Sequence, residues 1–250
     1  MKYNIFTVLN EPYAAFGKML VSSIFDKVDL DKVNRIIIAN TGISEDTENF
    51  LLQFPKVETM ATGMQTGHTR IHDQDWKKNV FSKAKLMLEA IRQEEEFVPT
   101  VLIDSDCVIV QDFSDLLEGD FDIAPCLRNQ AGRGAGHTAT STHIGSFFYA
   151  ATEKSIPFIE KWVELIPRIE GTSAKESPAL SYMCDKMSEE VKIKDICERT
   201  IANIELAPPP LARVYHLKSD AHCLTIPSRL KQNRTIYYLN RYLNGYDGDV

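Results

Sequence analysis

The sequence lacks any long hydrophobic run. No apolar stretch approaches the roughly 20 residues that a membrane-spanning helix needs. The N-terminal segment MKYNIFTVLNEPY has only a short apolar run, which Asn10 and Glu11 interrupt. This run is too short for the hydrophobic region of a secretory signal and is typical of a first strand. We therefore expect no membrane span and a cytoplasmic location.

Cysteines and basic residues are both scarce. The five cysteines are odd in number, widely spaced and never arranged as Cys-x-x-Cys. This pattern argues against a disulfide framework or a zinc site and predicts reduced, buried thiols. Lys and Arg total 28 against 35 Asp and Glu, which gives a net charge of -7. Because no basic surplus exists to cover phosphates, nucleic acid is not the expected partner.

Strand-like and helix-like segments alternate along the 250 residues. Segments rich in β-branched residues predict strands at 2–9, 33–39, 56–60, 100–103, 121–126, 144–151 and 212–217. Apolar residues at helical spacing predict helices at 13–25, from Ser44 onward, and at 79–92, 156–166 and 178–187. This alternation predicts an α/β fold in which a parallel sheet lies between two helix layers. No repeat or linker interrupts it, so we expect a single domain over 1–250.

The stretch RNQAGRGAGHTATSTH, from Arg128 to His143, has three glycines and almost no large apolar residue. Such a stretch cannot pack into a core and predicts a surface loop. A loop at this place could fold over a ligand bound at the neighbouring sheet edge.

Asp104 and Asp106 follow the apolar strand at 100–103. Ligands of open α/β sheets bind beyond the carboxyl ends of the strands, and residues i and i+2 of an extended segment point the same way. Two neighbouring carboxylates repel each other unless one is protonated or a cation lies between them. Their hard oxygen atoms suit Mn²⁺ or Mg²⁺. The alternative is a pair of acids that caps a turn and contacts nearby lysines.

The segment LIDSD, followed by DFSDLL, resembles the Asp-x-Asp segment of GT-A type glycosyltransferases. Further segments resemble other parts of these enzymes in the same order. FTVLN and EPYAAFGKMLVSSI are similar to their first strand and nucleotide-side helix, and FSKAKLMLEAI to their lysine-bearing helix. HIGSFFYAATEKSIPFIEKW, KESPALSYM and VYHLK are similar to the strand after the motif, a later acidic segment and a late histidine strand. His143 and Glu176-Ser177 depart from the residues usual at these places.

This resemblance implies a GT-A, nucleotide-diphospho-sugar transferase fold, a Rossmann-like three-layer αβα sandwich with a glycogenin-like, family-8-like layout. A nucleotide-binding half would cover about 1–112, an acceptor-side half about 113–222 and a C-terminal extension about 223–250. It also implies an enzyme that moves a sugar from a nucleotide-sugar donor, by preference a UDP-sugar, to a glycan or another hydroxyl acceptor. A homodimer is a possible assembly of such an enzyme.

The resemblance also assigns residues to roles. Asp104, Asp106 and His216 would bind Mn²⁺ or Mg²⁺, and Asp106 and Glu176 would be catalytic. Lys83 and Lys85 lie on different faces of one helix, and the resemblance selects Lys85 for the donor. The full set expected at the donor comprises Thr7, Leu9, Asn40, Thr41, Lys85, Asp104, Ser105, His143, Gly145 and Lys218. Structural roles remain open for each: a core-edge histidine, a solvated lysine, or an acid at a helix start.

Two other functions remain open. DSDCV also fits the nucleophile motif of haloacid-dehalogenase-type phosphatases, but no later buried strand ends in the acidic pair that those enzymes need. Asp247 and Asp249 lie in the polar last residues instead. A non-catalytic module that binds nucleotide sugars could use the same fold, since fold does not imply function. Turnover would distinguish the enzyme from the module.

Overall fold

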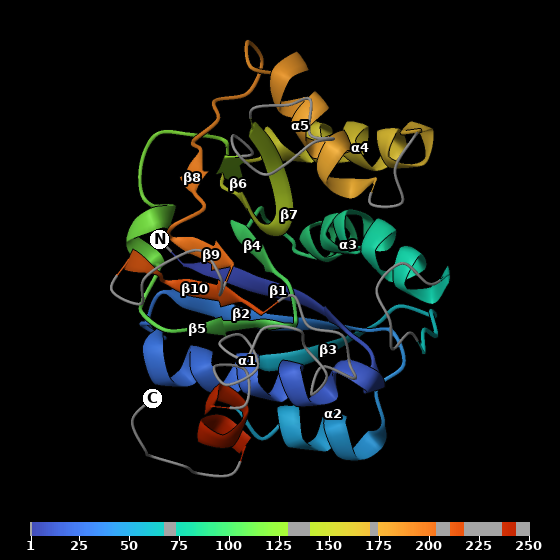
Figure 1. Ribbon diagram of the computed structural model, residues 1–250, viewed down its shortest axis with the longest axis vertical. Coiled ribbons are helices and arrows are strands. Elements are labelled where there is room, and N and C mark those ends of the chain that lie inside the picture. Colours follow the sequence, from blue (N-terminus) through green and yellow to red (C-terminus); the bar gives the residue numbers. More distant parts are fainter. Residues whose placement is uncertain are drawn as a thin grey trace.

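The computed structural model describes residues 2–67, 74–129, 141–170, 175–203, 211–217 and 237–243. Its centre is a seven-stranded sheet with the order β3-β2-β1-β4-β7-β6-β8 (Figure 1). The strands of this sheet are β1 Tyr3–Leu9, β2 Val33–Asn40, β3 Val57–Ala61, β4 Thr100–Ile103, β6 Ile123–Asn129, β7 Ser141–Ala150 and β8 Ile196–Cys197. A smaller sheet has the order β5-β10-β9, with β5 Cys107–Ile109, β9 Ile201–Asn203 and β10 Val214–His216.

Helices cover both faces of the large sheet. They are α1 Ala14–Lys27, α2 Glu45–Leu51, α3 Gln74–Arg92, α4 Ser155–Leu165 and α5 Glu176–Lys186, with short 3-10 turns at Glu11–Tyr13, Ser114–Leu117 and Ile166–Arg168. Residues 237–243 form a further helix. Figure 1 shows α1 and α2 on one side of the strands and α3, α4 and α5 on the other. None of the described helices combines the length and apolar character that a bilayer crossing needs.

Alternation along β1 explains the three layers. Ile5 packs in one cluster with Leu20 of α1, whereas its neighbour Phe6 packs in another with Met87 of α3. Successive side chains of a strand point to opposite faces, so a strand that is apolar throughout must be covered on both. The predicted three-layer α/β fold is therefore confirmed. Ser44 also caps α2 as predicted, because its hydroxyl accepts the backbone N–H of Thr47 at 3.2 Å.

The prediction of an all-parallel sheet is wrong at β7. Strands β1 to β4 of the large sheet pair in parallel, but β7 runs antiparallel to both β4 and β6. Strands β6 and β7 follow one another in the chain and pair directly, which only an antiparallel arrangement allows without a crossover helix. They also shorten the predicted loop at 128–143, since residues 128, 129 and 141–143 belong to strands. Residues 130–140 lie outside the described ranges.

Candidate active site

The two aspartates lie in a tight turn at the carboxyl end of β4. The backbone N–H of Cys107 closes this turn by donating to the carbonyl of Asp104 at 3.0 Å, and β5 begins there. The N–H of Asp104 donates to the carbonyl of Ser146 on β7 at 3.1 Å. The turn is therefore fixed from both sides, and Asp104, Ser105 and Asp106 are half-buried at the sheet edge.

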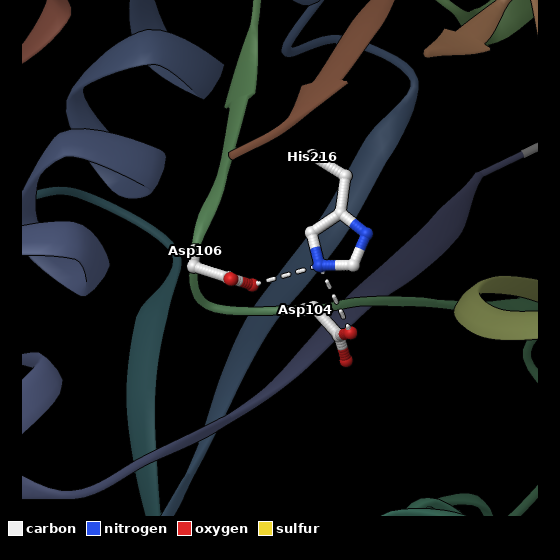
Figure 2. Close-up of side chains that lie close together, drawn as sticks. All are labelled: Asp104, Asp106 and His216. Atoms are coloured by element: carbon white, nitrogen blue, oxygen red, sulfur yellow. Dashed lines mark ion pairs between the residues drawn. The ribbon is translucent and has the colours of Figure 1, made fainter. Parts of the chain in front are cut away.

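Strand β10 brings His216 to this turn. It pairs antiparallel with β5 so that His216 lies opposite Cys107, and the N–H of Leu217 donates to the carbonyl of Asp106 at 3.0 Å. Nε2 of His216 lies 3.3 Å from Oδ1 of Asp106 and 3.7 Å from Oδ2 of Asp104. Figure 2 shows the ring nitrogen facing both carboxylates. The juxtaposition of these three residues, far apart in the sequence, is as the sequence predicts.

The three side chains have the geometry of a metal site. One ligand atom from each lies within 4.8 Å of the other two. Two carboxylate oxygens and one imidazole nitrogen suit Mn²⁺, which accepts nitrogen ligands more readily than Mg²⁺ does. Nε2 of His216 is the ring nitrogen that faces both acids, and Nδ1 is buried without a hydrogen-bond partner within the described residues. The residues therefore fit a divalent cation.

Lys83 of α3 connects the turn to α5. Its ammonium lies 2.5 Å from Oδ1 of Asp104, 3.2 Å from Oε2 of Glu176 and 3.4 Å from the carbonyl of Gly145. Burial opposes the charge on Lys83, but Asp104 and Glu176 outweigh it and raise the pKa of the ammonium above its usual value. Lys83 therefore remains charged in the protein interior.

Glu176 is the most deeply placed acid of the group. It begins α5, and only 5% of the residue is exposed. Burial raises the pKa of this carboxyl to about 7, although Lys83 pulls in the opposite direction. Its Oε1 is buried without a hydrogen-bond partner among the described residues. The family resemblance implied a catalytic role for this carboxylate, and the structure places it against Lys83 and the backbone of β7.

Gly145 makes this close approach possible. A Cβ atom at position 145 would lie 2.5 Å from Cδ of Glu176, closer than real contacts allow. The pairing of β6 with β7 is irregular here, because Pro125 pairs with Phe148 while the next residue, Cys126, pairs with Ile144. Such bulges redirect a strand and are frequent beside active sites. Gly145 thus serves the site by lacking a side chain.

The selection of Lys85 as the site lysine is not supported by the structure. Its side chain is 63% exposed and lies 3.5 Å from Glu89 on the outer face of α3. Lys83 is instead 8% exposed and shares the inner face of the helix with the buried Met87. Sequence reasoning missed Lys83, although residues four apart in a helix share a face and Met87 marks the buried one.

His143 makes a separate set of contacts. Its Nε2 lies 2.8 Å from Oδ1 of Asp195, and its backbone N–H donates to the hydroxyl of Ser181 on α5 at 2.8 Å. These contacts tie the start of β7 to α5 and to the segment before β8. The structure therefore gives His143 a supporting position for the strand that carries Gly145.

Residues predicted beside the donor base on β1 are buried. Leu9 is fully buried against α1, where a Cβ at Gly17 would lie 2.5 Å from Cδ2 of Leu9. The hydroxyl of Thr7 is also buried and has no hydrogen-bond partner in the described part of the chain. Neither side chain is exposed at the edge of the sheet.

Residues predicted beside the base at the end of β2 shape a turn. Oδ1 of Asn40 accepts the backbone N–H groups of Gly42 and Ile43 at 2.8 and 3.0 Å. The hydroxyl of Thr41 donates to the carbonyl of Leu9 at 3.1 Å and thereby joins the ends of β2 and β1. Lys218, predicted beside the diphosphate, lies outside the described residues.

Comparison with known proteins agrees with this architecture. A family model described as nucleotide-diphospho-sugar transferase matches residues 50–228. No curated protein sequence matches the chain at a significant level.

Several solved glycosyltransferases share the fold. Galactosyltransferase LgtC, solved with donor and acceptor sugar analogs, is 12% identical with a TM-score of 0.61, and the match covers 95% of each chain. GlyE of Streptococcus pneumoniae TIGR4 is 13% identical with a TM-score of 0.62, covering 98% of this chain and 63% of GlyE. The bifunctional glycosyltransferase WbbM is 11% identical with a TM-score of 0.58, covering 95% of this chain and 49% of WbbM. These matches confirm the predicted GT-A fold and support neither alternative function.

Proposed function

Because the chain belongs to the nucleotide-diphospho-sugar transferase family, we propose that it is a metal-dependent enzyme that moves a sugar from a nucleotide-diphosphate sugar to a hydroxyl acceptor. The predicted enzyme class, a glycosyltransferase, follows from the family. One observation carries the metal dependence: Asp104, Asp106 and His216 converge at the carboxyl end of a central strand. Ligands bind at this edge in open α/β sheets.

The cation site consists of oxygens of Asp104 and Asp106 together with Nε2 of His216. Mn²⁺ is the favoured ion because of the nitrogen ligand, with Mg²⁺ as the alternative. When bound, the cation would act as a Lewis acid that stabilises the negative charge growing on the leaving diphosphate. Ser105, between the two aspartates, would contact the same donor.

The donor nucleotide is proposed to lie over the carboxyl ends of β1, β2 and β4. The turn at Asn40 and Thr41 would then lie beside the base, and the buried Thr7 and Leu9 would support the sheet edge beneath it from within the core. The family-8-like layout of the sequence favours a uridine donor. The acceptor is a glycan or another hydroxyl-bearing molecule.

In the reaction the bond between the anomeric carbon and the diphosphate oxygen breaks, and a bond from that carbon to the acceptor oxygen forms. The nucleoside diphosphate leaves with the bonding electron pair, and the acceptor hydroxyl gives its proton to an oxygen of this leaving diphosphate or to water. Lys83 holds the Asp104 carboxylate in place throughout, because its ammonium is buried between two acids. Water must be kept from the anomeric carbon, since hydrolysis of the donor competes with transfer.

A thermal-shift panel tests the donor class. UDP-, GDP- and CDP-sugars are each added with and without Mn²⁺. We expect stabilisation by the UDP-sugars that depends on Mn²⁺, together with slow release of UDP. Stabilisation without any release of nucleotide in the presence of acceptors would favour a binding module. Hydrolysis of a simple phosphate monoester would favour the phosphatase.

A further inference from the structure

Asp104 and three other charged side chains form one group at the carboxyl end of β4. Asp104, Asp106 and Glu176 are carboxylates, and the ammonium of Lys83 contacts two of them, Asp104 and Glu176. With all four ionised, the group has a net formal charge of two negatives, which one divalent cation neutralises. The charges of Lys83 and Glu176 cancel each other, so the net charge of the group is that of the two aspartates that face the metal.

The two oxygens of Asp104 are divided between two partners. Oδ1 contacts Lys83, and Oδ2 faces His216. Lys83 in turn lies between Asp104 and Glu176, at 2.5 and 3.2 Å. The position of the ammonium therefore determines which oxygen of Asp104 is available to the cation. Without the Glu176 carboxylate, the ammonium would be free to move toward the cation and would repel it.

From this geometry we propose that Glu176 is a positioning residue that acts through Lys83 and sets the affinity of the site for a divalent cation. It holds the ammonium on Oδ1 of Asp104 and neutralises its charge, and Gly145 provides the space in which it does so. This inference rests on the proposed metal site. It differs from the catalytic role that the family resemblance implied for Glu176.

The test is a set of Mn²⁺ affinities measured by electron paramagnetic resonance of the free ion, at about pH 8 so that Glu176 is ionised. Glu176→Gln should weaken Mn²⁺ binding by roughly tenfold or more, because the positive charge of Lys83 then lacks the Glu176 carboxylate and repels the cation. The double variant Lys83→Met/Glu176→Gln should bind within about threefold of the unaltered protein, since it restores the net charge. A merely structural role for Glu176 would not give this recovery.

A second variant tests the geometry without changing any charge. Gly145→Ala should displace the Glu176 carboxylate and weaken Mn²⁺ binding by roughly fivefold or more. Gly67→Ala is the matched control, because a Cβ there meets nothing within 4 Å, and it should bind Mn²⁺ normally. Circular dichroism and thermal unfolding verify that each variant is folded.

Three results would overturn the inference. The first is that Glu176→Gln binds Mn²⁺ as tightly as the unaltered protein does. The second is that the double variant shows no recovery. Each of these would overturn only the role of Glu176. In both cases Asp106→Asn would still abolish binding, so the metal site itself would stand. Absence of Mn²⁺ binding by the unaltered protein would overturn the metal site and, with it, this inference.

Discussion

The ammonium of Lys83 on α3 lies 2.5 Å from Oδ1 of Asp104, the first residue after β4. A helix of one outer layer thus neutralises an acid at the edge of the central sheet. The other oxygen of the same carboxylate faces His216, which comes from the smaller sheet. Asp104 is therefore the residue through which the helix, the central strand and the late histidine strand meet.

The first prediction compares the two lysines of α3. Lys83→Met should lower kcat/KM for the nucleotide sugar by roughly a hundredfold, because the carboxylates of Asp104 and Glu176 then repel each other without the cation between them. Lys85→Met should change it by less than about twofold, since Lys85 is exposed and pairs with Glu89. Equal losses in the two variants would contradict the assignment of Lys83 to the site.

The second prediction concerns pH in the metal-free protein. Burial raises the pKa of Glu176 from 4.5 to about 7, so the folded state binds this proton more tightly than the unfolded state does. The stabilisation is complete below the unfolded pKa and is lost as pH rises through the folded pKa. The free energy of unfolding of Glu176→Gln, relative to the unaltered protein, should therefore increase from about pH 5 to about pH 8.

Urea unfolding of both proteins across this range gives the measurement. Taking the difference between the two proteins removes the contributions of groups that they share. A difference that stays constant with pH would mean that Glu176 titrates normally and is not held in a buried environment.

The third prediction concerns the start of α2. Ser44→Ala should lower the free energy of unfolding by about 1 kcal/mol, because the Thr47 N–H loses the hydroxyl that accepts it. Ser44→Asp is the matched control, which restores an acceptor at the cap and should recover most of the loss. Chemical denaturation measures both, and an unchanged stability of Ser44→Ala would contradict the observed cap.

Much of the fold was predictable because long buried segments have clear patterns. The bounds of β4 match the prediction at 100–103, and β1, α1 and β2 differ from it by at most a few residues. The direction of β7 was not predictable, since a strand buried on both faces is apolar whether its neighbours are parallel or antiparallel. Strands β5, β8 and β9 were missed because each has only two or three residues, which is too short for a periodic pattern to be visible.

The metal-site residues were predictable and their surroundings were not. Asp104 and Asp106 stand together in the sequence, and the family resemblance supplied His216. The choice between Lys83 and Lys85 required the helical phase, which Met87 reveals once the buried face is known. The contact between Gly145 and Glu176 has no signature in the sequence, because it depends on how α5 packs against β7 in the folded protein.

Release of UDP from a UDP-sugar, measured with a matched hydroxyl acceptor, tests the central claim most directly. The unaltered protein should release UDP with added Mn²⁺ and stop when the metal is chelated. Asp106→Asn should lose this metal-dependent release, because a charged carboxylate ligand of the site becomes a neutral amide. Turnover that continues at full rate under chelation, or that Asp106→Asn leaves unchanged, would contradict a metal-dependent glycosyltransferase built on Asp104, Asp106 and His216.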